Sequence, residues 1–154
     1  MNKVIEDIKL DFEDVLIYPV PSDKPLTRKS VDIEIDWLDT KAYPVVISNM
    51  LSTGTYKIAN ILTPLKFFTF IHKEYTVEEH FKELSKMNDR RYIAITSGVQ
   101  SWDKERTIEV VKKYPDIGMI NVDIANVYAN VKGMLDTLQI YRKEFPHITI
   151  SAGN

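Results

Sequence analysis

An apolar run that ends in polar or small residues occurs five times after residue 43, and a helical pattern follows each of the first four runs. The runs cover residues 44–49, 67–73, 92–98, 119–126 and 148–154, and residues 55–62, 76–87, 102–114 and 127–145 lie between them. Short β-branched runs predict buried strands, whereas apolar residues three and four apart predict helices. Nearly continuous apolar strands that alternate with amphipathic helices indicate a parallel sheet covered by helices.

Local signals mark where several of these helices begin and end. Thr76 and Glu79 have the spacing of a capping box, in which each side chain accepts a hydrogen bond from the other residue's backbone amide. The helices before Pro115 and Pro146 are predicted to stop there, because the residue that precedes a proline disfavours the helical conformation.

Residues 1–42 do not follow this alternation. Residues 10–17 are compatible with a short helix or a strand, residues 19–25 form a proline-rich turn region, and residues 31–35 alternate like an exposed hairpin strand. We interpret residues 1–42 as an N-terminal extension rather than a second domain, and residues 43–154 as one α/β domain.

Composition excludes several kinds of chemistry. The net charge of −2 gives no reason to expect nucleic acid or an anionic membrane as a partner. The sequence contains no cysteine, so it provides neither a disulfide nor a thiolate, and this fits the reducing cytoplasm. Its three histidines form no metal-binding pair in sequence, and we expect no protein-bound metal.

Each predicted strand ends in groups that can bind a ligand. In parallel α/β folds, ligands bind outside the carboxyl ends of the strands. A polar residue at one strand end is more commonly just the start of a loop, but five such ends together, with charges at Lys73 and Asp123, indicate a binding face. The five ends are Ser48-Asn49, His72-Lys73, Thr96-Ser97-Gly98, Asp123 with Asn126, and Gly153-Asn154.

Five sequence blocks resemble the GMP reductase and IMP dehydrogenase family, in the family's order and with similar spacing. They are LDFEDVLI at residues 10–17, PVVISNM with GT at 44–55, FIHKEYTVEE at 70–79, VDIANVY at 122–128 and SAGN at 151–154. The similar family segments read LDFxDVLL, PIIAANMDTVGT, AVHKHYSVEE, IDVANGY and TIxAGN. The second and third blocks favour the reductase, and the second helix leads directly into the third strand, without the regulatory module that IMP dehydrogenases usually insert nearby.

The resemblance implies a (β/α)8 TIM-type barrel, of which this sequence covers the first five strand–helix units, with residues 1–42 as its N-terminal extension. A closed barrel of this type has eight strands and about 250 residues. Five strands leave the first and fifth with unpaired edges, and such edges invite association. We therefore expect a second polypeptide to complete the barrel with strands six to eight. A divided gene would give rise to such a chain, and so would a fragment of a longer product.

The resemblance also implies an activity. GMP reductases convert GMP to IMP and ammonia with NADPH: a cysteine adds to purine C2, ammonia leaves, and hydride from the nicotinamide attacks the adduct. In the family, the cysteine loop and the loops that bind the nucleotide phosphate follow the AGN segment. We therefore assign no catalytic residue to this chain, expect the cysteine on a partner chain, and expect the chain to be inactive alone.

Most matched positions belong to the cofactor side of the family's site. The resemblance places NADPH against Thr27, Arg28, Lys73, Asp123, Ile124, Ala125 and Asn154. The Arg28 guanidinium suits a phosphate and would come from a neighbouring subunit of the assembled enzyme. The alternatives are an exposed arginine in a polar turn, a solvated Lys73, and a helix-capping role for Asp123.

Ser48 and Met50 match family residues that pack against the purine nucleotide, GMP or IMP, although Met50 could also be ordinary core filler. His72 lies on an apolar strand, where a structural histidine is commoner than a general base. The chain departs from the family where Leu51 replaces a carboxylate, Glu74 a histidine and Val127 a glycine. These changes bear on cofactor affinity rather than on the fold.

Three functions are compatible with these observations. The favoured one is the N-terminal subunit of a split GMP reductase in the cytoplasm, within a higher oligomer such as a tetramer of barrels. The second is a non-catalytic interaction protein that binds or regulates an intact barrel enzyme of this family. The third is part of an IMP dehydrogenase that oxidises IMP with NAD.

Overall fold

The structure is a computed structural model of the 154-residue chain, and it describes residues 7–8, 10–23 and 25–153. The chain divides into two compact units, Met1–Asp32 and Ile33–Asn154. The described part of the first unit contains one 3-10 helix, η1 (Phe12–Asp14), which begins with a capping box between Asp11 and Asp14. The segment expected to be a short helix or a strand therefore holds a single helical turn.

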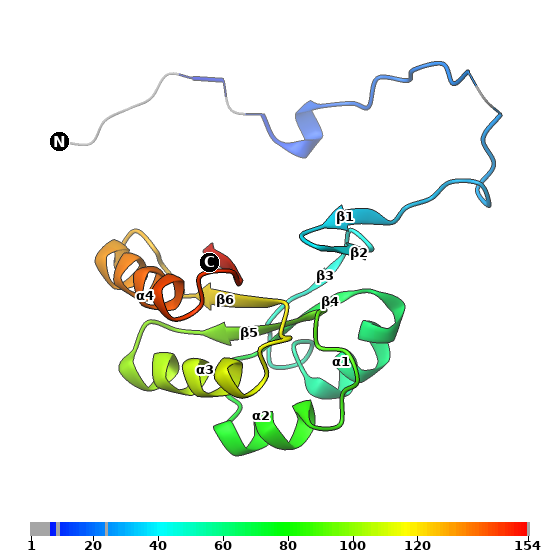
Figure 1. Cartoon of the computed structure of the whole chain (residues 1–154). Helices are drawn as coiled ribbons and strands as arrows, with labels where there is room; N and C mark the ends of the chain where they lie inside the picture. The colour runs from blue at the N-terminus through cyan, green and yellow to red at the C-terminus, as the bar shows by residue number, and fades with distance from the viewer. Residues whose placement is uncertain (1–6, 9, 24, 154) are drawn as a thin grey trace. The chain divides into compact units, whose positions relative to one another are not determined.

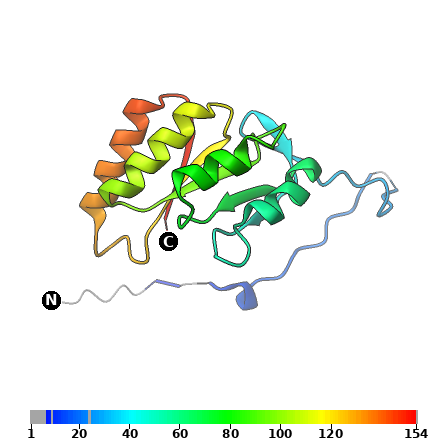
Figure 2. The same ribbon diagram turned by 90° about the horizontal axis from the view of Figure 1, so that it is seen from below.

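A five-stranded parallel sheet forms the centre of the second unit, with its strands in chain order (Figure 1). The strands are β3 (Val46–Ile47), β4 (Phe68–Ile71), β5 (Ile93–Ser97), β6 (Met119–Asp123) and β7 (Thr149–Gly153). The connecting helices are α1 (Tyr56–Leu62) with the 3-10 turn η2 (Thr63–Leu65), α2 (Val77–Leu84), α3 (Ser101–Lys113) and α4 (Val131–Glu144). Figure 2 shows the four α-helices side by side in chain order, on one face of the sheet.

The predicted helix boundaries are confirmed where they rest on a local signal. Thr76 and Glu79 form the capping box of α2, and α3 ends immediately before Tyr114, the residue that precedes Pro115. Helix α4 begins at Val131, four residues later than predicted, because two asparagine side chains organise the chain before it. Asn126 Oδ1 accepts a hydrogen bond from the Ala129 amide, and Asn130 Oδ1 caps the helix at the Gly133 amide.

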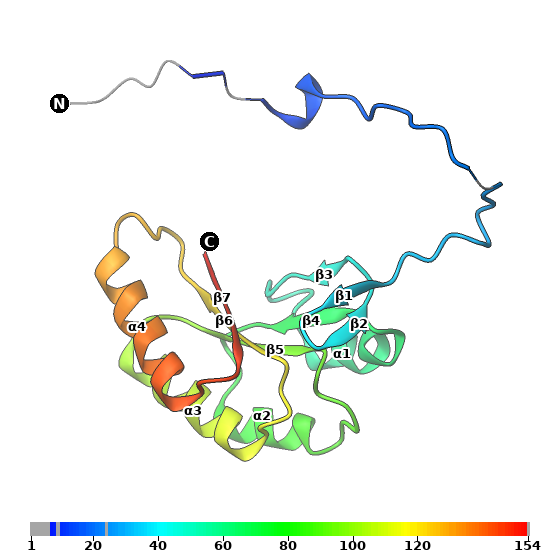
Figure 3. The ribbon, with the colours of Figure 1, turned by 45° about the horizontal axis from the view of Figure 1, so that its top comes forward.

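The hairpin predicted around residues 31–35 is wrong in position. The strands that pair are β1 (Ile35–Trp37) and β2 (Thr40–Ala42), joined by a two-residue turn in which Leu38 has φ 56°. Figure 3 shows this hairpin beside β4. The Tyr92 hydroxyl, just before β5, donates to the Lys41 carbonyl at 2.8 Å, so the hairpin covers the N-terminal ends of the strands.

The two faces of the sheet are covered differently. The face under the helices is mainly apolar, and Ile71, Ile95, Ile120 and Val122 are buried there against side chains of α1, α2, α3 and α4. Strand register places Thr96, Asn121 and Ser151 side by side on the opposite, concave face, where Asn121 Nδ2 donates to Thr96 Oγ1 at 3.3 Å. Among the described residues, no helix is long and apolar enough to cross a bilayer.

Candidate functional site

Two side chains from strands that are not neighbours meet at the carboxyl end of the sheet. Asn49 follows β3, Asp123 ends β6, and the Asn49 side-chain amide donates a 2.7 Å hydrogen bond to Asp123 Oδ2. Three strand spacings separate β3 from β6, which amounts to about 14 Å in a flat sheet. The sheet must therefore be strongly curled, and its curvature closes the carboxyl ends around a common centre.

A cavity of about 530 Å³ opens beside this hydrogen bond. Its size falls within the range of small-molecule sites in proteins. It brings together three of the predicted site residues, Met50, Lys73 and Asp123, which come from three different strand ends. The described residues that line it are Asn49, Met50, Leu51, Ser52, His72, Lys73, Glu74 and Asp123.

A second cavity, of about 400 Å³, shares Asn49 and Asp123 with the first and extends over the concave face toward β7. Ser48 lines this second cavity, where its hydroxyl lies 3.2 Å from the Thr53 hydroxyl. Ser48 and Met50 therefore lie in adjoining cavities. The Asn49–Asp123 pair belongs to the walls of both.

A glycine allows the loop after β3 to approach the end of β4. A Cβ atom on Gly54 would lie 2.4 Å from the Phe70 carbonyl oxygen and 2.8 Å from Asn49 Cα, so no side chain fits there. The Gly54 carbonyl accepts a 2.9 Å hydrogen bond from the His72 amide. The strand ends that carry Asn49 and His72 are thus held together by backbone contacts.

His72 faces the first cavity in a defined orientation, although its position in sequence favoured a structural role. Its ring stacks on Tyr75 at 4.3 Å between centroids, and its Nδ1 accepts a 3.2 Å hydrogen bond from the Glu74 amide. Burial lowers the pKa of His72 below its ordinary value, against the opposing charges of Glu74 and Glu79. The ring is therefore neutral at pH 7, with its proton on Nε2 as a hydrogen-bond donor.

The charges on the cavity wall are mixed. Lys73 supplies the one cation among the described lining residues, whereas Glu74 and Asp123 supply carboxylates. The Asp123 carboxylate accepts a hydrogen bond from the uncharged Asn49 amide. Met50 and Leu51 add apolar surface, because both side chains are more than half exposed. The cavity can therefore hold a flat ring against its apolar side while its polar rim binds hydroxyl or phosphate oxygens.

Other predicted site residues are not brought to this cavity. The Ile124 side chain packs against the apolar core and Ala125 is exposed, so neither lines the cavity. Thr27 belongs to the first compact unit, in a turn where its amide and hydroxyl both bond Ser30, and the neighbouring Arg28 is exposed. Asn154 lies outside the described residues.

The polar end of β5 has a structural role rather than the binding role that its residues suggested. Ser97 is fully buried, and its hydroxyl lies 2.5 Å from the Tyr141 hydroxyl of α4. Gly98 leaves space for the Asp103 carboxylate, because a Cβ atom there would lie 2.3 Å from Asp103 Oδ2. Neither residue reaches the two cavities at the carboxyl end.

Four lining residues were named from the sequence but were assigned no contact with the cofactor or the nucleotide, namely Asn49, Leu51, His72 and Glu74, and a fifth, Ser52, was not named. Asn49 and His72 each lie next to a predicted site residue, at a strand end already recognised as polar. That shared position was the available signal. Leu51 and Glu74 had been noted only as departures from the family pattern.

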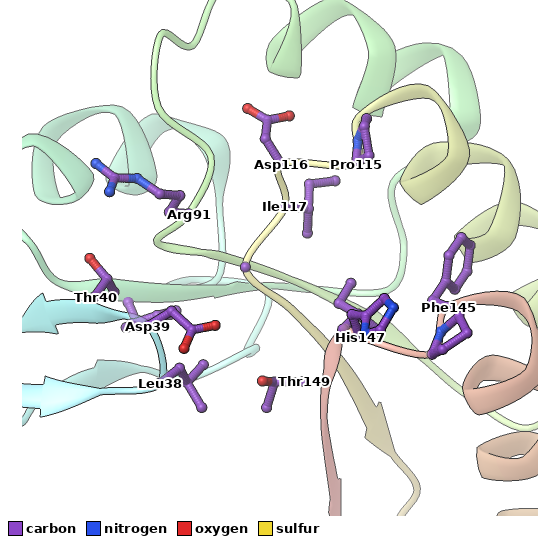
Figure 4. Close-up of a pocket in the computed structure, with 14 residues that line it drawn as sticks. Leu38, Asp39, Thr40, Arg91, Pro115, Asp116, Ile117, Phe145, His147 and Thr149 are labelled. Atoms are coloured by element: carbon purple, nitrogen blue, oxygen red, sulfur yellow. The ribbon is translucent and has the colours of Figure 1, made fainter.

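A third cavity, of about 410 Å³, lies at the opposite end of the sheet (Figure 4). The hairpin turn, the loop before β6 and the loop before β7 line it through residues such as Asp39, Asp116 and His147. None of the predicted site residues takes part. In parallel α/β folds ligands bind outside the carboxyl ends of the strands, so we place the candidate site at Asn49, Lys73 and Asp123.

Several known proteins resemble this chain in sequence over its whole length. No family model matches the chain. The GMP reductase of Phytophthora infestans is 34% identical to it, GMP reductase 1 of Rattus norvegicus 32%, and GMP reductase 2 of Homo sapiens 31%. These alignments cover 100% of this chain but 44%, 46% and 45% of those proteins. The chain thus spans less than half the length of the relatives that it matches.

A solved structure shows the same fold. The inosine 5′-monophosphate dehydrogenase of Legionella pneumophila superposes with a TM-score of 0.78 over 93% of this chain and 43% of that chain, at 23% sequence identity. The curled five-stranded sheet with helices on its outer face is therefore part of a TIM-type barrel, as the sequence predicts.

Proposed function

Because this chain is a relative of the GMP reductases within the GMP reductase and IMP dehydrogenase family, we propose that it is the N-terminal subunit of a split GMP reductase. A partner chain supplies strands six to eight and the catalytic cysteine, and the assembly converts GMP to IMP and ammonia with NADPH. The number of strands supports a partner that is a different polypeptide and not a second copy of this chain. Eight strands close a barrel of this type, and the described residues supply five, whereas two copies of this chain would supply ten.

The observation that carries this proposal is the contact between Asn49 and Asp123, with Lys73 on the wall of the same cavity. The contact fixes a carboxylate at the centre of the carboxyl-end face, and Lys73 places a cation beside it. A dinucleotide needs both: acceptors for its ribose hydroxyls and amide, and donors for its phosphates.

The lining residues fit one part of NADPH. The Lys73 ammonium and the His72 Nε2–H would donate to phosphate or ribose oxygens, and Asp123 would accept from a hydroxyl or the carboxamide. Met50 and Leu51 would pack beside a flat ring. When bound there, NADPH supplies the hydride that replaces the C2 amino group of GMP. Arg28 and Thr27 of a neighbouring subunit, together with Ile124, Ala125 and Asn154, complete the proposed cofactor contacts.

The substrate side of the proposal uses the adjoining cavity. Ser48 and Met50 would hold the purine nucleotide over the concave face, next to the cofactor. The partner's cysteine thiolate would form a bond to purine C2, ammonia would depart with the C2 nitrogen, and the thiolate would be released once C2 has gained hydrogen. This chain would contribute binding and orientation to that sequence of bonds.

A reconstitution assay tests the proposal. The chain is mixed with a candidate partner that begins at the sixth barrel unit and contains a cysteine. GMP and NADPH are then added, and the absorbance of the reduced cofactor is followed. Decay that requires both proteins and GMP is the expected result, with no decay from either protein alone. If both proteins are folded and the mixture leaves NADPH unchanged, the enzymatic function is rejected in favour of a non-catalytic interaction protein.

A further inference from the structure

Tyr75 connects the apolar core to the wall of the first cavity. Its ring stacks on the His72 imidazole, with 4.3 Å between the centroids and 20° between the planes. It also contacts the Tyr56 ring edge-on at 5.0 Å and the His80 ring at 5.7 Å. Tyr56 of α1 and His80 of α2 are both buried, whereas His72 lines the cavity. Tyr75 thus lies between two core residues and one residue of the candidate site.

The two core partners of Tyr75 are themselves held in place. The Tyr56 hydroxyl lies 2.5 Å from His80 Nδ1, and the two rings meet edge-on at 85°. Tyr56 is 2% exposed and His80 is fully buried. If either ring turned away, the other would be left as a buried polar group without this partner. Tyr75 therefore stacks on His72 from a rigid support.

Two contacts together fix the orientation of the His72 ring. The stack on Tyr75 sets the plane of the ring. The Glu74 amide donates to Nδ1 at 3.2 Å, and this hydrogen bond sets the rotation of the ring within that plane. With Nδ1 as the acceptor, a neutral ring carries its proton on Nε2. The Nε2–H group is the donor that His72 has left for a ligand.

We propose that Tyr75 is a positioning residue for the cofactor, because it holds the His72 ring in the orientation from which Nε2–H donates to a ribose or phosphate oxygen of NADPH. This inference rests on the proposed function and adds a residue that acts on the cofactor without lining the cavity. Without the stack, the imidazole would be free to turn about its side-chain torsions. A ligand would then have to stop that motion, and the entropy lost would weaken binding.

A purely structural role for Tyr75 is the alternative, since its side chain also packs against the apolar core. The two roles differ in how Tyr75 depends on His72. A structural role has the same effect on NADPH binding whether or not the imidazole is present. A positioning role disappears once the imidazole has been removed. Coupling between substitutions at the two residues therefore distinguishes the two roles.

A double-mutant cycle in the assembly of the full chain with its candidate partner tests this inference. The Kd for NADPH is measured from the fluorescence of the reduced nicotinamide. Tyr75→Leu keeps an apolar side chain but removes the stacked ring, and it should raise Kd about threefold to tenfold, the range for one hydrogen bond. In a His72→Ala background, the same substitution should change Kd by less than about twofold. Tyr75→Phe keeps the ring and should bind NADPH like wild type.

Tyr43→Leu is the matched control for the loss of a stacked ring. Tyr43 is also half-buried, and its ring stacks on Phe67 at 5.1 Å, but it precedes β3 and so lies toward the amino ends of the strands. This variant should leave the Kd for NADPH unchanged. Circular dichroism of the leucine variants checks that each of them is folded.

The outcomes separate the inference from the proposed function. Equal effects of Tyr75→Leu in the two backgrounds overturn the inference, and so does an unchanged Kd in Tyr75→Leu. An equal loss of affinity in Tyr75→Phe also overturns it, because the hydroxyl would then be the group that matters. GMP turnover without coupling leaves the proposed function standing. Coupled loss of NADPH binding in an assembly that does not convert GMP supports the inference and counts against the proposed function alone. A wild-type assembly that binds no NADPH overturns both.

Discussion

The Asn49 amide and the Asp123 carboxylate lie 2.7 Å apart across the carboxyl end of the sheet, although 74 residues and two intervening strands separate them. This hydrogen bond connects the first strand of the parallel sheet to the fourth. Both cavities at the carboxyl end have this pair in their walls.

Asn49→Ala should therefore lower the free energy of unfolding. The substitution leaves a partly buried carboxylate without its donor, which costs about 1–3 kcal/mol. Urea denaturation followed by circular dichroism measures the change. Asn60→Ala, at an exposed position on α1, is the control and should stay within about 0.5 kcal/mol of wild type. Coincident midpoints for Asn49→Ala and wild type would show that the contact contributes no stability.

The stability of the chain should fall in mild acid because of His80. This ring is fully buried on α2, its Nδ1 lies 2.5 Å from the Tyr56 hydroxyl, and burial lowers its pKa to about 3. In the unfolded chain the pKa returns to about 6.5, so below that pH the unfolded state binds a proton that the folded state does not. Proton binding by His80 therefore leaves the free energy of unfolding unchanged above about pH 6.5. Below that pH it lowers the free energy of unfolding by about 1.4 kcal/mol per pH unit. The pKa of His72 is shifted in the same direction and adds to the effect.

Unfolding free energies at about pH 7.5 and 5.5 test this expectation, with a loss of about 1.4 kcal/mol attributed to His80. His80→Gln should reduce the difference between the two pH values, whatever it does to stability at pH 7.5. His147→Gln, at an exposed position, should leave the difference intact. An unchanged pH dependence in His80→Gln would assign it to other groups.

Lys73→Ala should weaken cofactor binding in the reconstituted assembly. A lost charge-assisted hydrogen bond corresponds to a rise of about tenfold or more in KM for NADPH, with KM for GMP little affected. Lys73→Arg should restore part of the affinity, and Lys82→Ala, exposed on α2, should have no effect. A change confined to KM for GMP would move Lys73 to the substrate side of the site.

Glu74→Gln should have the opposite effect. Glu74 places a carboxylate on the cavity wall beside Lys73, so removing its charge strengthens attraction for a dianionic ligand. We expect KM for NADPH to fall roughly twofold to fivefold, and less at high salt because screening already weakens the repulsion. Glu78→Gln, exposed in the first turn of α2, is the matched control. A rise in KM would indicate that the Glu74 carboxylate contacts the ligand directly.

Thr76→Ala should destabilise α2 by removing its N-cap. The Thr76 hydroxyl accepts from the Glu79 amide at 3.2 Å, and Glu79 Oε2 accepts from the Thr76 amide at 2.8 Å. Loss of such a cap costs about 1 kcal/mol, whereas Thr76→Ser should retain most of it. The urea midpoint reports both variants. Equal losses for Ala and Ser would point to the threonine methyl group instead of the hydroxyl.

Sequence patterns predicted the order and type of the elements because each depends on neighbouring residues. The capping box at Thr76 and the helix end before Pro115 are local signals, and both are confirmed. The hairpin was misplaced because its turn carries no glycine or asparagine: Leu38 adopts the left-handed conformation that usually marks such residues. Nothing local to residues 31–35 indicates that pairing begins only at Ile35.

The candidate site was predictable only in part. Lys73 and Asp123 were found because polar residues end their strands, and the fold places such ends together. The hydrogen bond from Asn49 to Asp123 depends on how strongly the sheet curls, which is a property of long-range packing. The role of Ser97 was equally hidden, because its partner Tyr141 lies 44 residues later in the chain.

The row of Thr96, Asn121 and Ser151 on the concave face limits what this face can become by substitution. Thr96 is fully buried and Asn121 nearly so, and a hydrogen bond joins their side chains. Replacing either one alone by an apolar residue would leave the other polar group buried without its partner, at a cost of about 1–3 kcal/mol. An apolar lining at this point of the sheet is therefore reached only by changing both residues together.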